Sequence, residues 1–90
     1  MPYCTIVEFE WDETFDYRGF AELAEPDKVA EGRLTRIASI DATGARMIEV
    51  WRSGADARAF AEKSAPSLAA VQLPPPSLVQ GFEVTSYVVA

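Results

Sequence analysis

The spacing of apolar residues alternates between two periods along this chain, and that alternation limits the folds open to it. Strands place successive side chains on opposite faces, whereas a helix returns to one face every three to four residues. Helical spacing, with Tyr17, Phe20 and Ala24 on one face, occupies residues 12–26, and it returns after Ser53. Stretches rich in β-branched and aromatic residues predict strands at 3–11, 33–41, 45–52 and 78–89.

The resulting order, β-α-β-β-α-β, predicts an α+β fold of the ferredoxin-like type, the split β-α-β arrangement. Right-handed crossovers place both helices on one face of a four-stranded antiparallel sheet. The 90 residues make a single domain, residues 1–90. A chain of this length buries roughly two-thirds of its unfolded surface, so its core is modest.

Apolar residues are expected on both faces of this sheet. In the first strand, Tyr3, Val7 and Phe9 lie on one face, while Cys4 and Ile6 lie on the other. An uncovered second face would be a large apolar patch, which soluble monomers seldom expose. A second copy of the chain, joined sheet to sheet about a two-fold axis, would bury it, so we expect a homodimer and a dimeric α/β barrel.

Turn and cap signals mark the ends of the elements. Asp41 and Gly44 supply the chemistry of a hairpin turn, and Gly32 suits a helix stop in the left-handed region. Ser53, followed by Asp56 three positions later, predicts the start of the second helix.

Two later residues are expected to interrupt their elements. Pro66 breaks or restarts the second helix, with residues 67–73 as a second helical piece. Gly81, inside the last strand, marks either a bulge or a point where another group approaches the backbone closely.

The formal net charge of −6 argues against nucleic acid and against anionic membranes as partners, because both attract basic surfaces. The N-terminus lacks the pattern of a signal peptide, and no apolar run approaches the roughly 18 residues of a membrane span, so we expect a cytoplasmic protein. Cys4 is the only cysteine, which excludes an intrachain disulfide and predicts a buried thiol.

The chain contains no histidine, which excludes Ser–His–Asp and Cys–His catalytic sets. The five glycines are scattered and form no phosphate loop. Glu8 and Glu10 could approach Glu49 in the sheet, where clustered carboxylates would suggest acid–base work or a hard metal. Without histidine or ligand spacing we expect solvated strand-end acids, and neither a metal nor another cofactor.

Trp51, Glu49 and Arg36 are the main candidates for a functional role. Trp51 ends a strand beside a helix cap, where it either forms the wall of a pocket for an aromatic molecule or packs in the core. Glu49 and Arg36 alternate onto largely apolar faces of adjacent hairpin strands, and Leu34 is expected beside Arg36. They are predicted either to act as general acid or base and as anion holder, or to form a structural ion pair.

Tyr17, Phe20 and Tyr87 complete the candidate ligand-binding set. Phe20 belongs to the apolar face of the first helix. The hydroxyls of Tyr17 and Tyr87 either donate hydrogen bonds into a cavity between helix and sheet or sit at the surface of amphipathic packing.

The segments "IEVWRSGADARAF" (48–60) and "EGRLTRIAS" (31–39) resemble the dimeric α/β-barrel superfamily, and within it the small antibiotic-biosynthesis-monooxygenase-like proteins. The first segment is an apolar strand ending in Trp, a small cap, an acidic residue and a helical Phe. The resemblance implies a dimer paired through its sheets and a ligand cavity between each sheet and its helices. Trp51 matches the position where some oxygenases of this family place a functional tryptophan.

Cofactor-free oxygenases and haem-degrading relatives also use an Asn on the first strand and a His near the second helix, and this chain contains neither residue type. The sequence is therefore compatible with three functions. The first is a dimer that binds a small apolar or aromatic molecule. The second is a cofactor-free monooxygenase, or a cyclase or isomerase of polyketide-like substrates. The third is a dimeric interaction module without a ligand.

Overall fold

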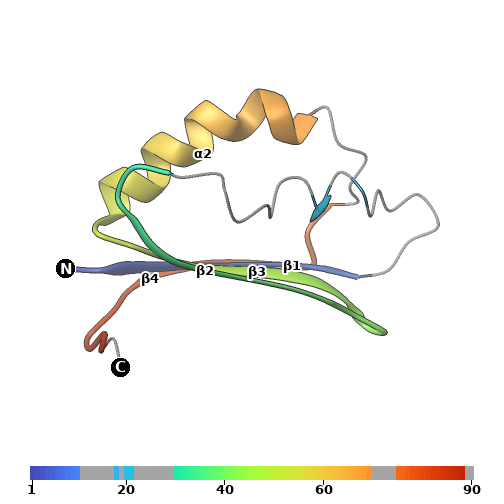
Figure 1. Ribbon diagram of the computed structural model, residues 1–90, viewed down its shortest axis with the longest axis horizontal. Helices are drawn as coiled ribbons and strands as arrows, with labels where there is room; N and C mark the ends of the chain where they lie inside the picture. Colours follow the sequence, from blue (N-terminus) through green and yellow to red (C-terminus); the bar gives the residue numbers. More distant parts are fainter. Residues whose placement is uncertain (11–17, 19, 22–29, 70–74, 89–90) are drawn as a thin grey trace.

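The computed structural model describes residues 1–10, 18, 20–21, 30–69 and 75–88, and shows a sheet with a helix lying across one of its faces (Figure 1). The sheet has four strands in the order β2-β3-β1-β4, and every neighbouring pair is antiparallel. This arrangement confirms the ferredoxin-like prediction. The elements are β1 (Tyr3–Glu10), β2 (Arg33–Asp41), β3 (Gly44–Trp51), α2 (Gly54–Ala69) and β4 (Leu78–Glu83).

The strand register decides which side chains share a face. Arg36 lies opposite Glu49, Glu49 opposite Thr5, and Thr5 opposite Gly81. Because side chains alternate along each strand, these four positions form one row on the side of the sheet that α2 covers. We call this side the helix face, the other side the open face, and the four positions the central row.

The hairpin between β2 and β3 turns on Asp41, as the sequence predicts. Asp41 Oδ1 accepts hydrogen bonds from Thr43 N at 2.8 Å, Thr43 Oγ1 at 2.6 Å and Gly44 N at 3.2 Å. Gly44 has a φ of 152°, and a Cβ there would collide with the carbonyl oxygen of Phe9. The bonds from Thr43, together with Arg46, lower the pKa of Asp41 to about 2.

The start of α2 confirms the predicted cap. Ser53 Oγ accepts a hydrogen bond from Asp56 N at 3.2 Å, and its hydroxyl donates to Asp56 Oδ2 at 3.0 Å. Arg52 pairs with the same carboxylate at 3.1 Å, and these bonds lower the pKa of Asp56. Gly32 adopts a φ of 80°, and a Cβ there would lie 2.5 Å from the Asp56 carboxyl carbon, so only glycine fits this approach.

Two element ends differ from the sequence prediction. α2 continues through Pro66 to Ala69, because a proline near the end of a helix forfeits one hydrogen bond while its fixed φ remains helical. β4 ends at Glu83 rather than at residue 89, because Glu83 lies opposite Tyr3, the first residue of its partner strand. The predicted strand residue Trp11 lies outside the described part of the chain.

The core lies between the helix face and the segments above it. Phe20 and Ala45 are each 2% exposed and pack with Phe9 and Met47. Phe9 and Phe20 meet edge to face, with ring centroids 6.3 Å apart. Phe20 is helical, so this described part of the predicted first helix packs on the sheet as expected.

Cys4 lies on the open face and is 7% exposed, and burial raises the pKa of its thiol. Among the described residues, no helix is long and apolar enough to cross a membrane.

Candidate functional site

A cavity of about 750 Å³ lies between the helix face and α2. Its walls are mainly apolar, and three residues of the central row, Thr5, Arg36 and Glu49, are among its polar lining residues. α2 contributes a wall of small and aromatic residues, because Ala57, Phe60 and Ala61 are spaced three and four positions apart and share one face of the helix. The strands contribute Thr5, Val7, Arg36, Met47, Glu49 and Trp51.

The cavity opens along β4. Val79 lines the cavity and is 66% exposed, whereas Glu49 and Trp51, on β3 in the interior of the same sheet, are 9% and 1% exposed. A ligand entering beside Val79 would meet Glu49 and Trp51 at the closed end.

Trp51 both lines the cavity and packs in the core, so the two readings of the sequence are compatible. Its indole lies against the Phe60 ring with centroids 5.1 Å apart. Its Nε1–H donates a hydrogen bond to Thr5 Oγ1 on the neighbouring strand β1, at 3.3 Å. The indole is therefore a rigid wall whose orientation is set by a hydrogen bond on one side and an aromatic ring on the other.

Glu49 and Arg36 meet on the cavity wall, and a second arginine joins them. Arg33 Nη1 lies 3.1 Å from Glu49 Oε2, and Arg36 Nη2 lies 3.2 Å from the same oxygen. The side chains of all three are only 10–12% exposed. The Arg33 guanidinium also lies over the Trp51 ring, 5.9 Å from its centroid.

The sequence alone does not predict Arg33 at this site. An irregularity in β2 shifts the register between Arg33 and Thr35, which places Arg33 opposite Trp51. Simple alternation put Leu34 beside Arg36. Leu34 falls within the shift, has no paired residue in the register and is 50% exposed, and it is not among the residues that line the cavity. No turn residue marks the irregularity in the sequence.

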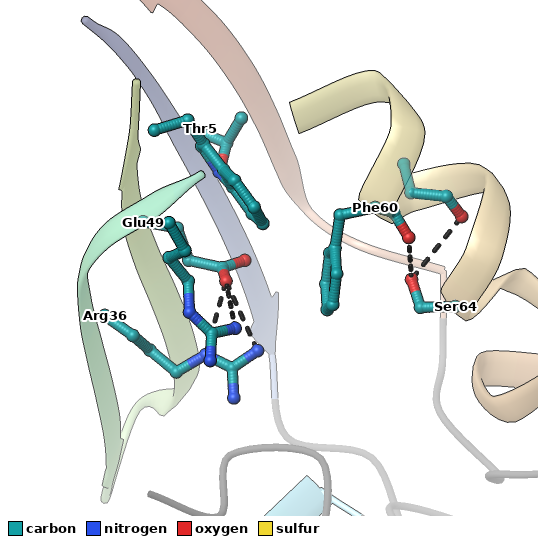
Figure 2. Close-up of polar contacts among 8 residues, drawn as sticks. Thr5, Arg36, Glu49, Phe60 and Ser64 are labelled. Atoms are coloured by element: carbon teal, nitrogen blue, oxygen red, sulfur yellow. Dashed lines mark hydrogen bonds and ion pairs between the residues drawn. The ribbon is translucent and has the colours of Figure 1, made fainter. Parts of the chain in front are cut away.

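Both guanidinium groups use one oxygen of Glu49, while its carboxylate faces Phe60 across the cavity (Figure 2). Within the described part of the chain, no group donates to Glu49 Oε1. The Glu49 side chain is 12% exposed, so a bound molecule that supplies a donor would take the place of water at this oxygen. The arrangement therefore offers an acceptor to a bound molecule, next to the Thr5 hydroxyl.

Of the remaining candidate residues, only Phe20 and Tyr87 lie in the described part of the chain. Phe20 lines the cavity, and Tyr17 lies outside the described residues. Tyr87 is not among the described cavity-lining residues. Its hydroxyl instead makes a hydrogen bond with Thr35 Oγ1, which belongs to the open face because Thr35 lies opposite Val50.

The prediction that Glu8 and Glu10 could approach Glu49 is wrong. Glu8 aligns with Arg46 and lies on the open face, where its carboxylate is 3.8 Å from Arg46 Nε. Parity along β1 separates Glu8 and Glu10 from the odd-numbered residues of the helix face. Among the described residues, no group of three Cys, Asp or Glu side chains could hold a metal ion.

No protein-family model matches this chain, and no curated protein matches it in sequence. Several solved structures match this chain, two of them over its full length. A candidate antibiotic biosynthesis monooxygenase from Chloroflexus aurantiacus J-10-fl matches with a TM-score of 0.72 and 17% identity, covering 100% of both chains. A second candidate antibiotic biosynthesis monooxygenase, from Deinococcus radiodurans, matches with a TM-score of 0.65 and 12% identity, covering 100% of this chain and 98% of its own. At these identities the likeness is one of fold, and it confirms that the chain adopts the ferredoxin-like fold of antibiotic-biosynthesis-monooxygenase-like proteins.

Proposed function

We propose that this protein is a homodimer that binds a small, mainly apolar or aromatic molecule in the cavity between α2 and the sheet. The observation that carries the proposal is the cavity itself. A volume of about 750 Å³ lies within the range of small-molecule sites, which are mostly apolar with a few convergent polar groups. Trp51 and Phe60 supply flat apolar walls, and Glu49 and Thr5 supply polar atoms at the closed end.

The homodimer is supported by the open face. Ile37 on β2 and Phe82 on β4 are 53% and 46% exposed there, and no helix of the described chain covers them (Figure 1). A second copy, related by a two-fold axis, presents the same apolar residues and buries both sets.

Native mass spectrometry on protein purified without denaturation tests the proposal. A mass of twice the chain plus a retained small molecule supports it, and the mass difference identifies the chemical class of the ligand. A monomer contradicts the dimer. A dimer that also fails to bind added naphthalene derivatives favours the interaction module over a ligand-binding protein.

A second candidate function, a cofactor-free monooxygenase, is favoured by the presence of Glu49, Arg36 and Trp51 in the lining of one cavity. Glu49 would take a proton from an acidic ring CH₂ group, and Arg36 would hold the resulting anion. The anion and dioxygen would then give a ketone and one water, so that CH₂ plus O₂ becomes C=O plus H₂O. A cyclase or isomerase using the same groups would consume no oxygen.

Anthrone is a suitable probe, because it carries one such CH₂ group between two aromatic rings. The oxygenase predicts uptake of one O₂ per anthrone consumed, and loss of that uptake in Glu49→Gln. Unchanged uptake in Glu49→Gln, or none above the buffer rate in the parent protein, would contradict it.

A further inference from the structure

Tyr3 occupies an unusual position on the helix face. It lies opposite Trp51 on one side and Glu83 on the other, and it lines the cavity. One edge of its ring faces the start of α2, because a Cβ at Gly54 would lie 3.4 Å from Tyr3 Cδ2. The ring therefore stands between the helix and the sheet, at the end of the cavity that borders β4.

The other edge of the ring lies over Gly81. A Cβ at Gly81 would fall on the Tyr3 hydroxyl, and would lie 3.0 Å from Cζ and 3.1 Å from Cε1. Gly81 is paired in register with Thr5 and shows no bulge, so the glycine serves the close approach of Tyr3. The space normally taken by a side chain at residue 81 is filled by the phenol of Tyr3.

Because the Tyr3 phenol occupies the side-chain space of Gly81, it extends the central row. Counted across the strands, the row reads Arg36, Glu49, Thr5 and then the Tyr3 hydroxyl above Gly81. Neighbouring strands are about 4.8 Å apart, so Glu49 and the Tyr3 hydroxyl lie roughly two strand spacings, about 10 Å, apart along the sheet. Polar atoms thus stand at both ends of a row bordered by apolar walls.

The hydrogen-bonding capacity of the row is incompletely used within the protein. Thr5 Oγ1 accepts from Trp51 Nε1, which leaves the Thr5 proton to donate. Among the described residues, no group bonds to the Tyr3 hydroxyl or donates to Glu49 Oε1. A ligand with a polar atom at each end of a flat apolar body would satisfy both.

We propose that Tyr3, positioned by Gly81, is a specificity-determining residue of this cavity and selects aromatic ligands that carry a second oxygen function at the end remote from Glu49. The inference rests on the proposed ligand-binding function and names the ligand class of that site. Val79 and Gly81, the two β4 residues of the helix face that line the cavity, offer only apolar contacts, and Gln80 belongs to the open face because it lies opposite Ile6. Without the phenol, a second oxygen on the ligand would therefore gain nothing from the helix face of β4.

The test compares two probes by isothermal titration calorimetry on the full chain. 2-Naphthol carries one hydroxyl, and 2,6-dihydroxynaphthalene adds a second at the far end of the same ring system. One neutral hydrogen bond predicts about fivefold tighter binding of the diol. Tyr3→Phe keeps the ring, so it should bring the affinity ratio to about one while leaving 2-naphthol affinity within about twofold.

Gly81→Ala gives a second, independent variant, because the added methyl group displaces the phenol without removing it. It should abolish the preference for the diol, and should have little further effect in the Tyr3→Phe background, since the effects of coupled residues do not add. Tyr87→Phe is the matched control, because it removes a phenol from the open face and should leave the ratio unchanged.

The outcomes separate the inference from the proposed function. An equal affinity for both probes in the parent protein, or a diol preference that persists in both Tyr3→Phe and Gly81→Ala, overturns the role of Tyr3 while the ligand cavity stands. Failure of both probes to bind the parent protein overturns the ligand-binding function, and the role of Tyr3 with it.

Discussion

The two faces of the sheet differ in how far their apolar side chains are buried within the chain. On the helix face, Trp51 and Phe20 are almost wholly buried, and the charge of Glu49 is paired with two arginines at the cavity wall. On the open face, Ile37 and Phe82 remain about half exposed. The chain therefore covers one face with its own segments and leaves apolar side chains on the other, where a second copy can supply the cover.

The open face is not wholly bare, because the segment after β4 folds back beneath it (Figure 1). Tyr87 reaches Thr35 on β2, the edge strand farthest from β4 in the sheet order. Thr35, Val50, Cys4 and Phe82 form one row of the open face, so this segment passes across that row. Only the rest of the face is left for a partner.

The largest effect is expected from Trp51→Ala, which removes a fully buried side chain from the helix face. Deleting a core aromatic residue costs about 3–5 kcal/mol, from lost burial and from the cavity left behind. Urea denaturation followed by circular dichroism measures the free energy of unfolding. A loss below about 1 kcal/mol would mean that the indole is not packed as the structure shows.

The second largest loss of unfolding free energy is expected from breaking an ion pair on the helix face, and it is compared with an ion pair on the open face. Glu49→Gln removes the charge that holds Arg33 and Arg36 at about 10% side-chain exposure, and breaking a buried pair of this kind costs about 3 kcal/mol. Glu8→Gln is the matched control, because its pair with Arg46 is more than one-third exposed and is worth at most about 1 kcal/mol. Equal losses in both variants would remove the distinction between the faces.

Which residues lie on each face could be predicted only in part from the sequence. Parity places Trp51, Glu49 and Arg36 on one face, because a continuous strand register preserves alternation. The same rule fails at Arg33 and Leu34, where an irregularity in β2 shifts the register. Tyr3 is placed on the correct face, but its lean over Gly81 depends on the pairing of β1 with β4, which alternation does not specify.

A charge introduced on the open face tests whether this face forms the homodimer interface. Ile37→Lys places an ammonium group in the middle of the expected interface, where an unpaired buried charge weakens association. Sedimentation equilibrium should show the mass changing from twice the chain to once the chain, with circular dichroism unchanged. Leu34→Lys is the control, because Leu34 is similarly exposed at the β2 irregularity. Ile37→Lys protein that stays dimeric would show that the open face is not the interface.

The smallest effect concerns Asp41, at the solvent end of the β2–β3 hairpin. Hydrogen bonds from Thr43 lower its pKa from 3.8 to about 2. Its folded-state pKa lies below its unfolded value, so the ionised carboxylate stabilises the fold above about pH 4. That stabilisation is lost as the pH falls from 4 toward 2. In this range Asp41 takes up a proton in the unfolded protein but remains ionised in the folded protein, so acid favours unfolding.

Asp41→Asn keeps an oxygen that can accept the bonds from Thr43 and removes the charge. Its stability should differ from that of the parent protein at pH 6, and the difference should shrink progressively between pH 4 and pH 2. Thermal unfolding at half-unit pH intervals measures this convergence. A constant difference across that range would mean that the turn is held by its hydrogen bonds alone, and that the ionisation of Asp41 contributes nothing to the stability of the sheet.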